Sequence, residues 1–239
     1  MLENLTIINE LPGYRVIFTR KKANFPKPIP YKKLIIDSQK AVYFEIPKVA
    51  CTTINFLLIR LFIRAGKKFS VQEVHTDPDL PRVWGRLDNK VASYFKFAFV
   101  RDPLTRIQSC FLDKIKPIGF NETEAYENGL YIPFKQFGDL FWPGMNFNDF
   151  AVSVSQIDDQ EADPHFRSQS SFVANNDDEL EIDFIGKFEN LESDLTRLLA
   201  RFGVEPDSIQ IPIVNKQKRP ESWELTERTR KLIHDRYHR

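Results

Sequence analysis

The feature that most constrains the fold is a threefold alternation of short apolar runs with longer helical patterns. The apolar runs are rich in aromatic and β-branched residues, as buried strands are: Ala41–Ile46, Lys96–Val100 and Ile182–Phe188. A segment with helical spacing follows each one: Thr53–Ala65, Leu104–Ile115 and Glu189–Phe202. This alternation predicts an α/β protein whose central parallel sheet is flanked by helices on both faces. Right-handed crossovers would place the three turns at one carboxyl edge, where ligands bind in such folds.

The remaining segments show no linker that would divide the chain. We predict a single domain over residues 1–239, with residues 1–40 as an N-terminal extension. Residues 117–150 interrupt the alternation and are rich in Phe, Tyr, Trp, Pro and Gly, which indicates an insertion with some helix over the sheet edge. Residues 221–239 have the pattern of an amphipathic helix.

Composition excludes several classes of function. The formal net charge of +1 gives no strong field toward nucleic acid. Two cysteines, Cys51 and Cys110, imply neither a disulfide framework nor a metal site. The longest apolar run, Ile54–Ile63, is broken by Asn55 and Arg60 and is too short to span a bilayer.

The turn after the first strand, in the sequence IPKVACTTI, is suited to an anion. A helix N-terminus offers unpaired N–H groups, and here small residues, two threonines and Lys48 surround it. Glycine and the Walker pattern are absent, which disfavours an ordinary nucleoside-triphosphate kinase. A Lys with a pair of Thr near a helix start also arises by chance. Cys51 could be an activated nucleophile, but a small packed residue is favoured because no phosphatase-type arginine follows it.

The turn after the second strand, in FVRDPLTRIQSCFLDK, strengthens the case for an anion site. Arg101 ends the strand, and Asp102 with Pro103 predicts an immediate helix start. Arg106 could pair with Asp102 and stiffen the turn. The Arg101 guanidinium suits phosphate, although a structural ion pair is the alternative. Two such turns at one edge predict a ligand with two separated anionic groups.

These two segments resemble the 5′-phosphosulfate and 3′-phosphate segments of sulfotransferases that use 3′-phosphoadenosine 5′-phosphosulfate (PAPS). Carbohydrate sulfotransferases of the chondroitin and HNK-1 type (sulfotransferase family 2) are the most similar. Downstream, DPHFRSQSSF and DFIGKFENLESDL also resemble blocks of this family, so that four blocks match in order from residue 44 to residue 201. Phe166 stands where the family usually has Trp, and Leu104 where it has an aromatic residue.

The resemblance implies a P-loop-containing nucleotide hydrolase-like fold and the roles of the donor-binding residues. Lys48 would stabilise the leaving phosphate oxygen, and Arg101 and Ser109 would bind the 3′-phosphate. The backbone around the first turn would bind the 5′-phosphate, through Lys48, Val49, Ala50, Cys51, Thr52 and Thr53. No metal is implied.

The acceptor side is less well defined by the sequence. Of four histidines, His75 occupies the place where related carbohydrate enzymes have a His, and we expect it to be the catalytic base. His165 is the rival, with an acceptor-orienting or structural role favoured for it, and Arg167 is a candidate for substrate binding. Residues 117–150 would lie near the acceptor site, where their aromatic residues could stack on sugars, although core packing is favoured for most of them. Residues 215–219, NKQKR, could fold over the nucleotide or form a solvated loop.

The sequence therefore predicts a PAPS-dependent sulfotransferase acting on a hydroxyl, most readily that of a carbohydrate. The alternatives are a small lipid or phenolic acceptor, a non-catalytic module that binds an anionic glycan or nucleotide, and a P-loop kinase. The N-terminus lacks the pattern of a signal peptide or an anchor, so we expect a cytoplasmic location in preference to the Golgi lumen.

Overall fold

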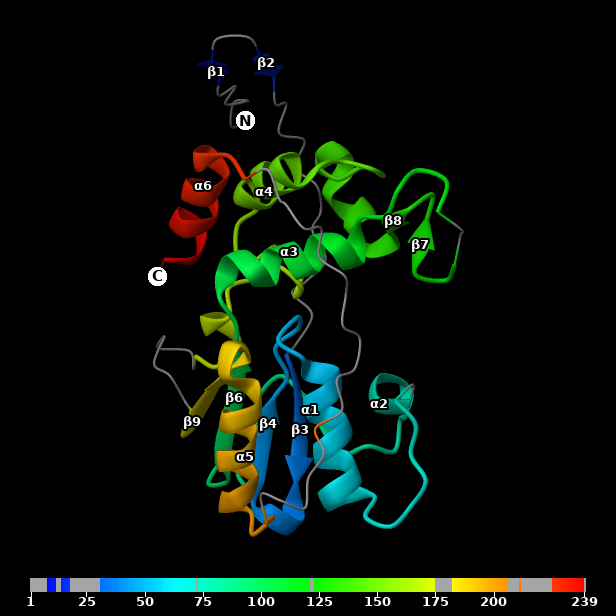
Figure 1. Ribbon diagram of the computed structural model, residues 1–239, viewed down its shortest axis with the longest axis vertical. Coiled ribbons are helices and arrows are strands. Elements are labelled where there is room, and N and C mark those ends of the chain that lie inside the picture. Colours follow the sequence, from blue (N-terminus) through cyan, green and yellow to red (C-terminus); the bar gives the residue numbers. More distant parts are fainter. Residues whose placement is uncertain are drawn as a thin grey trace.

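A computed structural model describes residues 8–11, 14–17, 31–71, 73–120, 123–174, 182–205, 211 and 225–238 (Figure 1). In chain order the elements are β1 (Ile8–Leu11), β2 (Tyr14–Ile17), β3 (Lys32–Ile36), η1 (Asp37–Gln39), β4 (Ala41–Phe44), α1 (Cys51–Leu58), η2 (Ile59–Ile63), α2 (Glu73–Thr76), β5 (Arg82–Trp84), β6 (Phe95–Val100), α3 (Pro103–Lys114), β7 (Tyr126–Glu127), β8 (Leu130–Tyr131), η3 (Ile132–Leu140), α4 (Phe147–Ser155), η4 (Ser170–Phe172), β9 (Phe184–Lys187), η5 (Phe188–Asn190), α5 (Leu191–Arg201) and α6 (Glu227–Tyr237).

The central sheet has five strands in the order β5-β3-β4-β6-β9. The three strands predicted from the apolar runs are its β4, β6 and β9, and they run parallel to one another. Their carboxyl ends therefore lie at one edge, as expected. The turns that follow them begin at Glu45, Arg101 and Phe188.

The prediction of an all-parallel sheet is corrected, because the sheet is mixed. β3 is antiparallel to both of its neighbours, β4 and β5. Only the short turn η1 and Lys40, with φ 48°, separate β3 from β4, and so short a connection can join antiparallel strands alone. The sheet thus begins within residues 1–40, the segment predicted as an extension.

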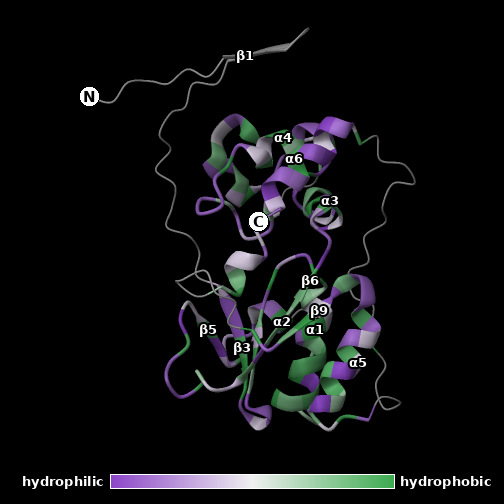
Figure 2. Cartoon of the chain, turned by 90° about the vertical axis from the view of Figure 1, so that its left-hand side faces the viewer, coloured by the Kyte–Doolittle hydropathy of each residue, from purple (hydrophilic) through white to green (hydrophobic). Residues whose placement is uncertain are grey.

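Two helices, α1 and α5, pack along the strands and bury the first hydrophobic core (Figures 1 and 2). Helix α1 begins two residues before the predicted start and passes at Ile59 into a π-helical turn, η2. Its apolar residues Ile54, Leu57 and Leu58 are buried against the sheet. In Figure 2 the strands and α1 are mainly green, whereas α5 carries both colours, as its amphipathic sequence predicts.

Helix α3 does not pack on a face of the sheet, where the helices of α/β proteins usually lie. It crosses the carboxyl edge of the sheet, between the strands and the helices α4 and α6 (Figure 1). Its buried residues Ile107 and Cys110 belong to a second hydrophobic core together with residues of α4 and α6. The helix therefore covers the edge where the three turns meet, and its near side can contribute to a site there.

The aromatic-rich segment, residues 117–150, supplies seven of the sixteen buried residues that the structure describes in this second core. Phe134, Phe137 and Phe141 are buried, and their rings contact one another with centroids 4.8 to 6.2 Å apart. Core packing is confirmed for these three residues. Trp142 is 43% exposed.

We predict that Gly186→Ala destabilises the protein. Gly186 is buried in β9, and a Cβ there would lie 2.3 Å from a ring carbon of Phe99. Because the ring is itself fully buried, the clash should lower the free energy of unfolding by about 1–3 kcal/mol. Urea unfolding would measure this loss, with Lys187→Ala, an exposed change on the same strand, as the control. Equal midpoints for Gly186→Ala and the wild type would contradict the packing described.

Candidate active site at the carboxyl edge of the sheet

The loop between β4 and α1 has an unusual backbone. Lys48 and Ala50 have φ of 69° and 68°, in the left-handed region that glycine normally occupies. Ala50 is the N-cap of α1, and its carbonyl accepts from the Ile54 N–H at 3.1 Å. The small Ala50 side chain keeps the approach to the helix N-terminus open, so the loop can present amides to an anion without a glycine.

Arg101 connects the second turn to this loop. Its Nη1 donates to the Lys48 carbonyl at 3.1 Å, and its Nε donates to the Thr105 hydroxyl at 3.1 Å. The guanidinium carbon also lies 4.1 Å from the centre of the Phe188 ring. The two turns predicted to share a ligand therefore touch one another, and a single side chain joins them.

Helix α3 carries a polar stripe beside Arg101. Asp102 is its N-cap and accepts from the Thr105 N–H at 2.9 Å, as the Asp-Pro pair predicts. Thr105, Ser109 and Asp113 follow at intervals of four residues and share one face of the helix. Since Thr105 contacts Arg101, Ser109 lies on the side of α3 that Arg101 faces.

Arg106 does not pair with Asp102, and that expectation is corrected. Its side chain is buried at 1% exposure and donates to three backbone carbonyls, those of Pro47 (3.0 Å), Arg167 (2.7 Å) and Pro164 (3.0 Å). A buried charge requires such partners, and carbonyl groups supply them here. Arg106 thereby holds the first loop and the DPHFRSQ segment together through one guanidinium.

The two downstream blocks join the same edge through side chain to backbone hydrogen bonds. Gln169 accepts from the Arg101 N–H at 2.9 Å and donates to the Arg101 carbonyl at 2.8 Å. Glu189 accepts from the Asp102 N–H at 2.8 Å. All four sequence blocks that resemble the sulfotransferases therefore converge on residues 45–53 and 101–113.

Lys48 points toward α3 and pairs there with Asp113, a residue that the sequence analysis did not predict for the site. Its Nζ lies 2.8 Å from Oδ2 of Asp113, and Nζ of Lys114 lies 3.2 Å from the same oxygen. Burial alone would raise the pKa of Asp113, but the two ammonium groups hold it well below its usual range. The four-residue spacing from Thr105 and Ser109 was the signal that could have revealed Asp113.

His75 lies against the first loop. Its Nε2 is 3.0 Å from the hydroxyl of Thr52, the second residue of α1. Although His75 is exposed, partial desolvation by the surrounding protein, with the positive charge of Lys32, lowers its pKa. The neutral imidazole, which can accept a proton, therefore predominates near neutral pH.

A buried ion pair beneath the loop sets the position of His75. Arg82 donates from Nε to Glu45 at 3.0 Å and from Nη2 to the carbonyl of Val74, the residue before His75. Glu45 also accepts from the Asn55 amide at 2.8 Å. One network thus links β5, the end of β4, α1 and α2.

His165 and Arg167, the two candidates on the acceptor side, differ in their environments. His165 is partly exposed and bonds Asp163. Arg167 is only 3% exposed and donates from Nε and Nη2 to the Ala162 carbonyl. The expectation that Arg167 binds substrate is corrected, because this guanidinium is buried and engaged by the protein.

Neither cysteine has the properties of a nucleophile. Burial raises the pKa of the Cys51 thiol, and it raises that of Cys110 to about 12. Cys51 starts α1 and is partly buried, which fits the small packed residue favoured from the sequence.

Two features are absent from the described ranges, a metal-binding group and a membrane-spanning helix. No group of three or more His, Cys, Asp or Glu there could hold a metal ion. In the same ranges, no helix has the length and apolarity needed to cross a bilayer. The segment NKQKR at 215–219 lies outside the described residues.

Comparison with known proteins agrees with the resemblance. The profile of the sulfotransferase family matches residues 32–239. Carbohydrate sulfotransferase 14 of Danio rerio is 26% identical over 194 residues, which cover 75% of this chain and 50% of that protein. Carbohydrate sulfotransferase 11 of Danio rerio is 24% identical over 230 residues, with coverages of 83% and 60%. Carbohydrate sulfotransferase 9 of Homo sapiens is 27% identical over 232 residues, with coverages of 84% and 50%.

This chain therefore spans 50% to 60% of the length of these relatives. No solved structure matches it significantly.

The expectation of a cytoplasmic location is wrong. The matched relatives are carbohydrate sulfotransferases of the Golgi type, which act in the lumen. Because the chain covers only part of each relative, the point where it begins says nothing about a leader or an anchor.

The family profile spans both hydrophobic cores and all four converging blocks, from β3 to the end of α6. The chain belongs to the sulfotransferase family.

Proposed function

We propose that this protein transfers the sulfuryl group of PAPS to a hydroxyl of a carbohydrate. The observation that carries the proposal is the contact of Arg101 with the carbonyl of Lys48, which brings two anion-suited turns to one edge of the sheet. A donor with a 5′-phosphosulfate and a 3′-phosphate has two anionic groups for two such turns. The names of the relatives support a carbohydrate as the acceptor.

The first loop would bind the 5′ end of the donor. The backbone amides at the start of α1, with the hydroxyls of Thr52 and Thr53, would hold its phosphate, and Val49, fully buried, would fix the loop to the core. Lys48 would stabilise the charge that grows on the phosphate oxygen as the sulfur–oxygen bond breaks. We extend the proposal to a P-loop-like nucleotide fold, in which this loop replaces the Walker glycines.

The second turn would bind the 3′-phosphate through Arg101 and Ser109. Arg101 is a planar donor held by Thr105 and the Phe188 ring, and Ser109 lies one turn along the same face of α3. This pair would let the protein distinguish PAPS from nucleotides that lack the 3′-phosphate.

His75 would accept the proton of the attacking hydroxyl. The acceptor oxygen forms a bond to sulfur as the bond to the phosphate oxygen breaks, and the hydroxyl proton passes to the imidazole. The contact of His75 with Thr52 supports a place beside the transferred group. The aromatic-rich segment would lie on the acceptor side.

The donor site predicts a strong dependence of affinity on the 3′-phosphate. Arg101→Ala and Ser109→Ala should each weaken binding of 3′-phosphoadenosine 5′-phosphate, with about a tenfold or greater loss for Arg101→Ala, because hydrogen bonds to a charged group are removed. Binding of 5′-AMP should change little in Ser109→Ala. Isothermal titration calorimetry measures both ligands, and equal affinity of the wild type for the two would contradict the donor assignment.

If His75 is the catalytic base, its removal should slow turnover without weakening donor binding. His75→Ala should lower turnover by about 100-fold or more, which is the usual contribution of a general base, while the affinity for 3′-phosphoadenosine 5′-phosphate stays at the wild-type level. Transfer from radiolabelled PAPS to unsulfated chondroitin oligosaccharides provides the rate. His238→Ala, on an exposed residue at the end of α6, is the matched control. Near-full turnover in His75→Ala would exclude it as the base.

The lowered pKa of His75 predicts the acid limb of the pH profile. A base must be neutral, so activity should be lost as the pH falls through the lowered pKa, at a midpoint below the ordinary value of 6.5. Lys32→Met removes a nearby positive charge and should move this midpoint to higher pH, whereas Lys67→Met, an exposed change, should leave it in place. Profiles of kcat/KM would measure the shift, and an unmoved midpoint in Lys32→Met would count against His75.

A further inference from the structure

The segment that Arg106 attaches to the first loop carries a histidine fixed by a buried carboxylate. Nδ1 of His165 lies 2.6 Å from Oδ1 of Asp163, and the backbone N–H of His165 donates to the same oxygen at 2.9 Å. Asp163 is 3% exposed. A carboxylate can only accept hydrogen bonds, so Nδ1 of His165 carries a proton and donates it. In the neutral imidazole, Nε2 then has a free lone pair.

Nε2 of His165 has no hydrogen-bond partner among the residues that the structure describes. The side chain is 23% exposed, so a ligand can reach it. Burial lowers the pKa of His165 even though Asp163 opposes the shift, which keeps the ring neutral and Nε2 unprotonated.

A series of side-chain contacts links the His165 ring to Lys48. The imidazole meets the Tyr131 ring edge-on at a centroid distance of 5.6 Å, and Nζ of Lys114 lies 3.7 Å from the centre of that same Tyr131 ring. Lys114 shares the Asp113 carboxylate with Lys48. A continuous set of contacts thus runs from Asp163 to the lysine that the proposed reaction uses.

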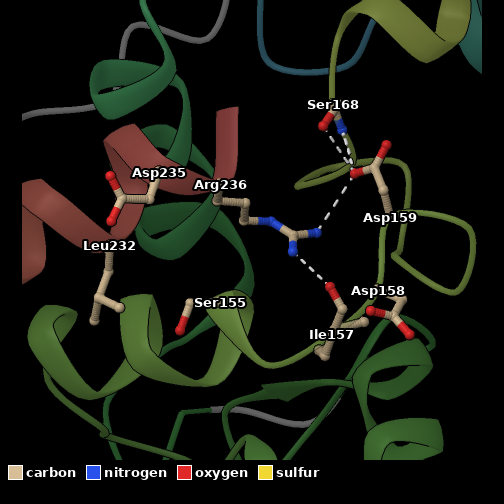
Figure 3. Close-up of a pocket in the computed structure, with 8 residues that line it drawn as sticks. All are labelled: Ser155, Ile157, Asp158, Asp159, Ser168, Leu232, Asp235 and Arg236. Atoms are coloured by element: carbon tan, nitrogen blue, oxygen red, sulfur yellow. Dashed lines mark hydrogen bonds and ion pairs between the residues drawn. The ribbon is translucent and has the colours of Figure 1, made fainter. Parts of the chain in front are cut away.

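Two sets of anchors hold the segment in this place. On one side, Arg106 binds the carbonyls of Pro47 and Pro164, which directly precede Lys48 and His165 in the chain. On the other, Arg236 of α6 reaches across a hollow to the carbonyl of Ile157 and to Asp159, as Figure 3 shows.

Asp159 in turn accepts from the N–H and the hydroxyl of Ser168, at 2.8 and 2.9 Å (Figure 3). The segment that carries His165 is therefore fixed at both ends, and its free nitrogen has a defined position that Tyr131, Lys114 and Asp113 link to Lys48.

We propose that Nε2 of His165 accepts a hydrogen bond from a hydroxyl of the acceptor sugar and so orients that sugar against Lys48. This inference rests on the proposed function and deepens it. His75 and His165 then have separate tasks, since His75 touches the donor loop whereas the Asp163 carboxylate fixes the ring of His165. A site built to bond one hydroxyl discriminates strongly against an acceptor that lacks it. The geometry therefore assigns part of the acceptor specificity to His165.

Two substitutions separate this role from a structural one. In His165→Asn the shorter amide can still donate to Asp163 but places no acceptor atom at the position of Nε2. In His165→Gln the longer amide places a polar atom near that position, so it should restore part of the function. His234→Ala, on an exposed residue of α6, is the matched control. Thermal unfolding of each variant would verify that it folds.

The readouts are KM for unsulfated chondroitin oligosaccharides, kcat, and the affinity for 3′-phosphoadenosine 5′-phosphate. For His165→Asn we expect KM to rise roughly tenfold, the worth of one hydrogen bond, with smaller changes in kcat and an unchanged donor affinity. His165→Gln should fall between His165→Asn and the wild type. A large loss of kcat at constant KM would make His165 the base and overturn the orienting role, and an unchanged KM would overturn it as well.

Nitrogen NMR of histidine-labelled protein tests the same contact without turnover. The His165 ring should show the proton on Nδ1, and the Nε2 signal should move when chondroitin oligosaccharides are added with 3′-phosphoadenosine 5′-phosphate present. A proton on Nε2, or a signal that the oligosaccharides leave unmoved, would overturn the inference. Failure of the proposed function is recognised separately, because the wild type would then show no preference for the 3′-phosphate in calorimetry.

Discussion

The hydrogen bonds of the Arg106 guanidinium are the interaction on which the geometry of the candidate active site depends. The guanidinium is buried, and its donors go to the carbonyls of Pro47, Pro164 and Arg167. An arginine cannot shed its charge, so burial is tolerated only with such partners in place. Those partners belong to two segments more than a hundred residues apart in the sequence, and neither is part of a helix or strand. Satisfying one charge therefore fixes the relative position of two irregular loops, which no sheet or helix would otherwise determine.

Around this centre the charges fit the proposed reaction between an anionic donor and a neutral hydroxyl. Lys48 and Lys114 share the single carboxylate of Asp113, so the pair keeps net positive charge at the edge of the sheet. The two histidines have lowered pKa values, both mainly through desolvation. Cationic lysines and neutral imidazoles are what the proposed transfer would need, because negative charge would move between oxygens while a proton leaves the acceptor.

The strands and turns of the candidate site could largely be predicted from the sequence. The contacts between distant segments could not, because hydrophobic periodicity does not report them. The strands β4, β6 and β9 and the turns after them were predictable because short aromatic and β-branched runs and the Asp102-Pro103 pair are local signals. The antiparallel strand β3 was not predicted, because no strand pattern was recognised within residues 1–40. Asp113 and the bonds of Arg106 depend on long-range packing, which no local pattern reports. Arg167 misled because a sequence does not distinguish a buried guanidinium from an exposed one.

The loop between β4 and α1 has a further consequence that follows from its lack of glycine. Lys48 and Ala50 adopt left-handed backbone angles that cost each residue roughly 1 kcal/mol, and the surrounding contacts hold them there. A glycine-rich loop explores many conformations when empty and loses that freedom when it closes on a phosphate. Here the loop residues have few alternative backbone conformations, because packing orders them when the protein folds. Less conformational entropy then remains to be lost when an anion binds, so the loop is a preorganised anion site and does not need to close over its ligand.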